Sequence, residues 1–124
     1  MTSALLYLAA GLCVATACIH SYFGEKRLIA PVIKSGRGVM ANDLARQILR
    51  FAWHWTSALW ILVGAYLVLA AQDLPQHALL VRVIGLVHLA AGLLDGYFTR
   101  GRHIGWPPIT LIGVFALIGS FYGA

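Results

Sequence analysis

The sequence predicts an all-α integral membrane protein: a bundle of four transmembrane helices with both termini on the non-cytoplasmic side. Hydrophobic residues make up 60% of the 124 residues and charged residues only 10%, which is too little charge to cover the surface of a soluble domain. Four apolar stretches each approach the roughly 20 residues that a helix needs to cross a hydrocarbon core of about 30 Å. Because these stretches use most of the chain, we expect residues 1–124 to form a single transmembrane domain.

The ends of the four predicted helices follow from local signals. Asn42 and Asp43 are suitable N-cap residues for the second helix. Pro107 and Pro108 suit the first turn of the fourth. Residues 24–43 are predicted to form the longest loop, whose apolar segment around its proline would lie in the membrane interface. The helices are therefore expected at approximately 4–23, 43–71, 77–99 and 107–123.

Basic residues predict the orientation of the bundle. Eight of the nine lysines and arginines lie in or beside the first and third connections, which leaves Arg82 alone toward the opposite side. Excess positive charge marks cytoplasmic connections, so both termini are predicted to lie outside, with the chain in the plasma (inner) membrane. The basic residues behind the net charge of +5 are thus expected to set the orientation of the helices and to contact the lipid bilayer. Nucleic acid is not an expected partner.

Small and polar residues recur at helical spacing on one side of each predicted helix. Helices in lipid associate through such residues because the surrounding tails are as apolar as leucine. These stripes therefore predict the faces that pack inside the bundle, and the candidate site residues lie on them. The four stripes consist of Ala10, Cys13, Ala17, His20 and Gly24; Gln47, Arg50, His54, Ser57, Ile61 and Gly64; Gly85, His88, Gly92, Asp95 and Thr99; and Ile109, Gly113, Ala116 and Ser120.

Three histidines and one aspartate within the apolar stretches form the candidate site. An ionisable side chain is costly in lipid, so a functional role is the default hypothesis. Counting turns places His20, His54 and Asp95 in one layer near the cytoplasmic interface, with His88 roughly 10 Å deeper than Asp95. The alternative for Asp95 is a structural ion pair with Arg50, Arg100 or His20. The residues expected around the mouth of this layer are Glu25, Arg50, Arg100 and His103.

This cluster suggests three kinds of ligand. In a haem site, His54 and His88 would be the axial ligands, and Arg50 and Arg100 would hold the propionates. A quinone-like molecule is the second kind. The third kind is a divalent transition metal, for which His20, His54 and Asp95 would supply nitrogen and oxygen ligands.

No catalytic residue is predicted, because the sequence carries no phosphate loop, dinucleotide fingerprint or nucleophile motif.

Two further functions remain open. The chain could be an accessory or scaffold subunit of a larger membrane complex, because a short bundle leaves little room for chemistry of its own. It could also be a small proton-coupled transporter that acts as a homodimer and moves protons through His88 and Asp95. Gly92 and Gly96 match the small-xxx-small pattern of helix association. Both functions require a partner, either another membrane protein or a second copy of the chain.

Overall fold

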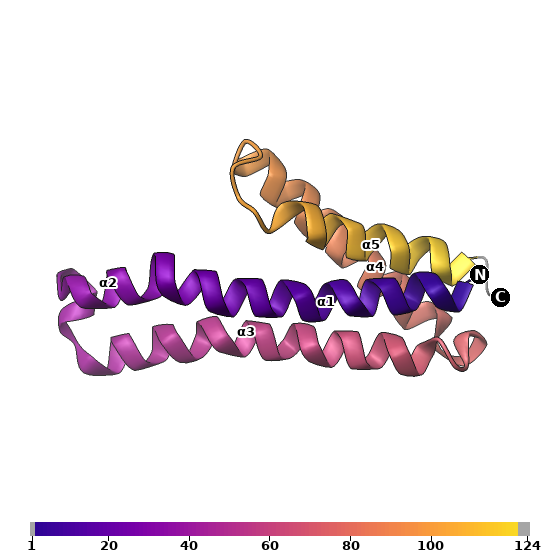
Figure 1. Ribbon diagram of the computed structural model, residues 1–124, viewed down its shortest axis with the longest axis horizontal. Helices are drawn as coiled ribbons and strands as arrows, with labels where there is room; N and C mark the ends of the chain where they lie inside the picture. Colours follow the sequence, from indigo (N-terminus) through magenta and orange to yellow (C-terminus); the bar gives the residue numbers. More distant parts are fainter. Residues whose placement is uncertain (1, 122–124) are drawn as a thin grey trace.

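The computed structural model describes residues 2–121, and over that range every regular element is a helix. The four predicted helices are present as α1 (Thr2–Gly24), α3 (Asp43–Ala70), α4 (Leu74–Phe98) and α5 (Trp106–Phe121). Figure 1 shows α1 and α3 lying side by side and antiparallel, with α4 and α5 forming a second antiparallel pair, the α4–α5 hairpin. α5 packs on α1, and the hairpin diverges from α1 toward its own turn (Figure 1).

The sequence predicts that the first helix ends near residue 23, but the helical conformation extends further in the structure. It continues through a π-helical turn, η1 (Glu25–Ile29), into α2 (Ala30–Ser35), so most of the predicted loop is helical. Pro31 lies in the first turn of α2, and the wider π turn before it makes room for the proline ring. The chain reverses at Gly36, whose φ of 58° is left-handed and costs glycine nothing. A 3-10 turn, η2 (Gly38–Ala41), then leads to α3.

The starts of the other helices follow the predicted signals. The Asn42 side chain accepts hydrogen bonds from the backbone N–H groups of Leu44 and Ala45 at 2.8 and 3.3 Å, which confirms this N-cap. α4 begins at Leu74, earlier than predicted, because Pro75 fits the first turn of a helix. α5 has both prolines of its predicted start in its first turn. The predicted end of α5 at residue 123 lies outside the described residues.

Three segments are long and apolar enough to cross a membrane: Ser3–Ser35, Asp43–Ala70 and Leu74–Phe98. The 33 residues of the first correspond to roughly 50 Å at 1.5 Å per residue, well beyond a hydrocarbon core of about 30 Å. α5 is apolar, but its 16 described residues give only about 24 Å. The described chain therefore contains three full-length candidate spans and one shorter apolar helix.

The stripes of small residues face neighbouring helices, as predicted. A Cβ added at Gly64 of α3 would lie 3.1 Å from the Ala10 carbonyl oxygen and 3.2 Å from the Cys13 Cβ, so α1 and α3 approach closely there. Three members of the predicted stripes, Gln47, Arg50 and Ile61, are exposed instead. The core lies toward the start of α1 and contains Leu6, Ala9, Ala10, Cys13, Leu67, Ala70, Leu74, Val81, Ile112 and Ala116.

Candidate functional site

A cavity of about 270 Å³ lies between α1, α3 and the start of α5. Its lining also includes residues 103–105, which belong to the turn of the α4–α5 hairpin. The volume is close to the lower end of the roughly 300–1,000 Å³ typical of small-molecule sites. We refer to it as the interhelical cavity. Its lining includes the polar residues Thr16, His20, Arg27 and His103, the aromatic residues Phe23, Trp53 and Trp60, and the aliphatic residues Ile19, Leu28, Ile104 and Ile109.

One continuous face of the first helix forms a wall of the interhelical cavity. The lining residues from Thr16 to Leu28 are spaced alternately by three positions and by one, a spacing that keeps side chains on one helical face. Arg27 and Leu28 belong to this face because the helix continues through η1 instead of ending near residue 23. The unpredicted helical turn therefore places an arginine beside the cavity.

His20 is held against two tryptophans of α3. Its ring stacks on Trp53, with centroids 4.1 Å apart and planes 9° apart, and meets Trp60 edge-on at 5.2 Å. Trp53 Nε1–H donates to the His20 carbonyl oxygen at 3.1 Å. Gly24 makes room for this arrangement, since a Cβ there would lie 2.3 Å from Trp53 Nε1. The last residue of α1 is therefore required for the cavity wall.

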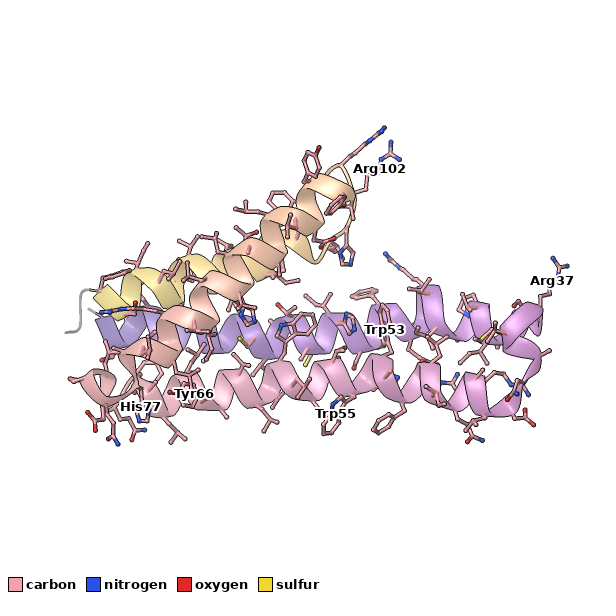
Figure 2. All side chains as sticks on the ribbon, turned by 180° about the vertical axis from the view of Figure 1, so that it is seen from behind. Arg37, Trp53, Trp55, Tyr66, His77 and Arg102 are labelled. Carbon is pink, nitrogen blue, oxygen red and sulfur yellow. The ribbon has the colours of Figure 1, made fainter. Side chains whose placement is uncertain are left out.

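The two tryptophans that flank His54 in the sequence have different surroundings. Figure 2 shows Trp53 on the side that faces the α4–α5 hairpin and Trp55 on the opposite side of α3. Trp55 is 51% exposed and stacks on Phe51, with ring centroids 5.9 Å apart. One tryptophan therefore reports on the interhelical cavity and the other on the outer surface of the same helix.

Thr16 adds an unsatisfied polar group to the wall of the interhelical cavity. Thr16 is only 3% exposed, and its Oγ1 has no hydrogen-bond partner within residues 2–121. A buried hydroxyl without a partner costs roughly 1–3 kcal/mol. The Oγ1 atom is itself inaccessible to water, so a molecule in the cavity would reach it only after the Thr16 side chain rotates.

A polar network, the Glu25 network, joins α3 to the end of α1 beside the interhelical cavity. The Glu25 carboxylate accepts a hydrogen bond from Arg50 at 2.8 Å, and its second oxygen lies 3.3 Å from His54 Nε2. His54 Nδ1 lies 3.0 Å from the hydroxyl of Ser21, which is hydrogen-bonded to the Ser57 hydroxyl at 2.9 Å. Both ring nitrogens of His54 are therefore engaged, and Glu25 and Arg50 belong to the same network.

The structure brings two of the three predicted layer residues to the α1–α3 interface. His20 Nε2 is hydrogen-bonded to Thr56 of α3 at 3.1 Å, and His54 belongs to the Glu25 network. Asp95 lies on the α4–α5 hairpin instead, with its carboxylate 2.5 Å from His103 Nδ1. Asp95 therefore has a side-chain partner within its own hairpin, His103, and this residue is not among the three partners that sequence reasoning considered.

The predicted metal ligands are divided between the two helix pairs. Within residues 2–121, no group of three or more His, Cys, Asp or Glu side chains is arranged to hold a metal ion. The reason is that Asp95 follows the hairpin away from the α1–α3 interface, where His20 and His54 lie. The metal-site hypothesis therefore gains no support from the described residues.

The predicted haem ligands have separate partners. His88 Nδ1 is hydrogen-bonded to the Ile84 carbonyl oxygen of its own helix at 2.8 Å, whereas His54 and Arg50 both contact the first helix through the Glu25 network. Arg100 is exposed in the turn of the hairpin, with a φ of 53°. Within residues 2–121 no hydrogen bond or ring stacking joins the two histidines. The haem site stays a prediction.

Sequence reasoning missed most of the wall of the interhelical cavity. Thr16, Arg27 and Ile109 are not among the predicted site residues, although they line the cavity with His20 and His103. The spacing of residues 16–28 was the available signal, but it is visible only if the first helix is extended past Gly24. The approach of the hairpin to this face has no local signal.

Comparison of the chain with protein-family models, with curated proteins and with solved structures finds no match. Function is therefore argued from the interhelical cavity and the Glu25 network. The accessory-subunit and transporter hypotheses, together with the protein partner or second copy that they require, stay predictions.

Proposed function

We propose that the chain is a multi-pass integral protein of the plasma (inner) membrane that binds a small amphipathic molecule in the interhelical cavity. The apolar lengths of Ser3–Ser35, Asp43–Ala70 and Leu74–Phe98 support insertion. Figure 2 shows Arg37 and Arg102 toward one end of the molecule and His77 at the other. The excess of basic residues at the first end supports a cytoplasmic location for it and a non-cytoplasmic location for the termini.

The insertion and orientation can be tested with single cysteines. We would replace Cys13 and Cys18 by alanine and introduce Ser35→Cys or Asp73→Cys, both at exposed positions. A membrane-impermeant maleimide should label Asp73→Cys in intact cells and Ser35→Cys only after the cells are opened. The reverse pattern would contradict the orientation, and release of the chain by alkaline carbonate would contradict insertion.

The combination of an apolar wall with a few polar groups supports ligand binding. Binding sites for small molecules are largely apolar and contain a small number of polar groups that fix orientation. Here Trp53, Trp60 and Ile109 supply apolar area, and His20, Arg27 and His103 supply polar groups. A quinone-like molecule, one of the ligands that the sequence suggests, belongs to this amphipathic class. The observation that supports the proposal most directly is the interhelical cavity itself.

Tryptophan fluorescence provides a direct test of binding. A protein with Trp55→Phe and Trp106→Phe keeps Trp53 and Trp60 as its only tryptophans, and both line the cavity. Dibrominated stearate and a short-chain benzoquinone are suitable quenching probes. At least one of them should quench this protein in a saturable manner, as expected for a site, whereas a protein that keeps only Trp55 should show linear quenching from partition into the detergent or lipid.

A pair of substitutions in α5 controls for indirect effects. Ile109→Phe would add volume to the wall of the interhelical cavity, whereas Ile118→Phe changes a residue of the same helix that is 40% exposed. Saturable quenching should disappear in the first variant and persist in the second. If neither probe gives a saturable component in the parent protein, the proposed binding function is wrong.

A further inference from the structure

The polar side of the interhelical cavity is basic. Arg27, His20 and His103 line it, and none of its lining residues is acidic. The Arg27 guanidinium carbon lies 4.8 Å from the centroid of the Phe23 ring, a cation–π arrangement that holds the charge at the edge of the apolar wall. The lining therefore combines one permanent cation with two imidazoles, of which that of His103 is already in contact with Asp95 outside the lining.

The acidic residues of the chain are all accounted for elsewhere. There are four of them, and each lies within the described residues. Glu25 is paired with Arg50 and Asp95 with His103. Asp43 is paired with Arg46, and Asp73 precedes α4 in the turn at the far end of α3 from the cavity. No side-chain carboxylate is therefore left to neutralise Arg27.

We infer that the molecule held in the interhelical cavity is a single-chain amphiphile with an anionic head, a carboxylate or a phosphate monoester, taken from the cytoplasmic leaflet. This inference rests on the proposed function. An arginine beside an apolar wall gains most from a planar or tetrahedral oxyanion, because its guanidinium donates two parallel hydrogen bonds to such a group. Thr16 also lines this cavity, and its hydroxyl has no hydrogen-bond partner among residues 2–121.

The size of the interhelical cavity selects a single chain. Its 270 Å³ correspond to about nine water volumes of roughly 30 Å³ each, enough for an anionic head and the first methylenes of one chain. Ile19, Ile109 and Trp60 supply the apolar surface that these methylenes require. Burial of each methylene contributes about 0.8 kcal/mol in general, so an amphiphile is favoured over a free anion.

The test compares a charged probe with its neutral ester. In the protein that keeps only Trp53 and Trp60, dibrominated stearate and its methyl ester are titrated at neutral pH. We expect the acid to bind more tightly than the ester. Arg27→Gln should weaken binding of the acid by roughly tenfold or more and leave the ester unchanged. Arg37→Gln, which removes an exposed arginine beyond α2, is the matched control and should change neither.

Competition identifies the source of the anion. A lysophospholipid with a phosphate monoester head should displace dibrominated stearate, and inorganic phosphate should not. Displacement by inorganic phosphate at the same concentration would show a site for free anions and overturn the inference that the ligand is an amphiphile.

Equal binding of acid and ester, or unchanged binding of the acid by the Arg27→Gln protein, would overturn the inference of an anionic head while leaving the proposed function intact. Absence of saturable binding by every probe would instead contradict the proposed function. Persistent ester binding shows that the Arg27→Gln protein is folded.

Discussion

The two antiparallel helix pairs of this protein use small residues to different extents. In the α4–α5 hairpin the backbones touch along most of the contact. A Cβ at Gly92 would lie 2.5 Å from the Thr110 amide nitrogen, and one at Gly113 would lie 2.4 Å from the Leu89 amide nitrogen. Contacts this short exist only because glycine has no side chain. The hairpin is therefore a closely packed pair held by van der Waals contact.

The α1–α3 pair packs closely in the half that contains the start of α1 and the end of α3. There Gly64 meets Ala10 and Cys13. In the other half, the contact consists of the Glu25 network and of the Trp53 ring stacked on His20. These side chains are too large for the hairpin to approach as closely, and the interhelical cavity lies beside them. Close packing is therefore a property of the α4–α5 hairpin, whereas the larger side chains between α1 and α3 leave room for the candidate site.

The largest expected effect comes from enlarging a glycine in the hairpin. Gly92→Ala places a Cβ against the backbone of Thr110 and should lower the free energy of unfolding by about 3 kcal/mol, because backbone atoms cannot rotate away. Unfolding of the detergent-solubilised protein by dodecyl sulfate, followed by circular dichroism, measures this. Gly11→Ala is the control, since a Cβ there has no neighbour within 4 Å. Equal stabilities of the two variants would refute the account of close packing.

A smaller effect is expected from the Glu25 network. Glu25→Gln removes the charge that pairs with Arg50, whose side chain is 49% exposed, and should cost about 1 kcal/mol after allowance for solvent screening. A double-mutant cycle with Arg50→Gln measures the coupling between the two residues. The Asp43–Arg46 pair is the control, because the Asp43 side chain is 82% exposed and its coupling should stay below about 0.5 kcal/mol. Similar couplings in both cycles would show that the network contributes no more than a surface pair.

The smallest effect is expected from the turn of the hairpin. Asp95→Asn weakens the contact with His103, whose side chain is 49% exposed, and should change global stability by about 0.5 kcal/mol or less. Its main consequence should be local, because the contact closes only the turn at residues 99–105. Faster amide hydrogen exchange in that turn, with unchanged exchange in α3, is the expected result. A uniform increase across all helices would mean that the pair supports the whole bundle.

Part of the candidate site could be predicted from the sequence. The positions of His20 and His54 on the small-residue faces of their helices predicted that both point into the bundle. The structure places both at the α1–α3 interface. Asp95 lies on a comparable stripe, and its turn count matches theirs, yet it pairs with His103. Turn counting gives the position of a residue along a helix. It does not give the angle between two helix pairs, and that angle separates Asp95 from the histidines.

The sequence by itself determined the four main helices and their apolar character, the Asn42 cap and the small-residue faces. Periodicity, hydropathy and capping act within a few neighbouring residues. Only the structure showed that three of the four helices, rather than all four, have spanning length over the described residues. The tertiary structure alone decided that the first helix continues through η1, that Trp53 lies over Gly24 and that the hairpin diverges to leave the interhelical cavity. These features depend on contacts between side chains far apart in the chain. Their geometry is set by the volume and shape of both partners together, which no single segment records.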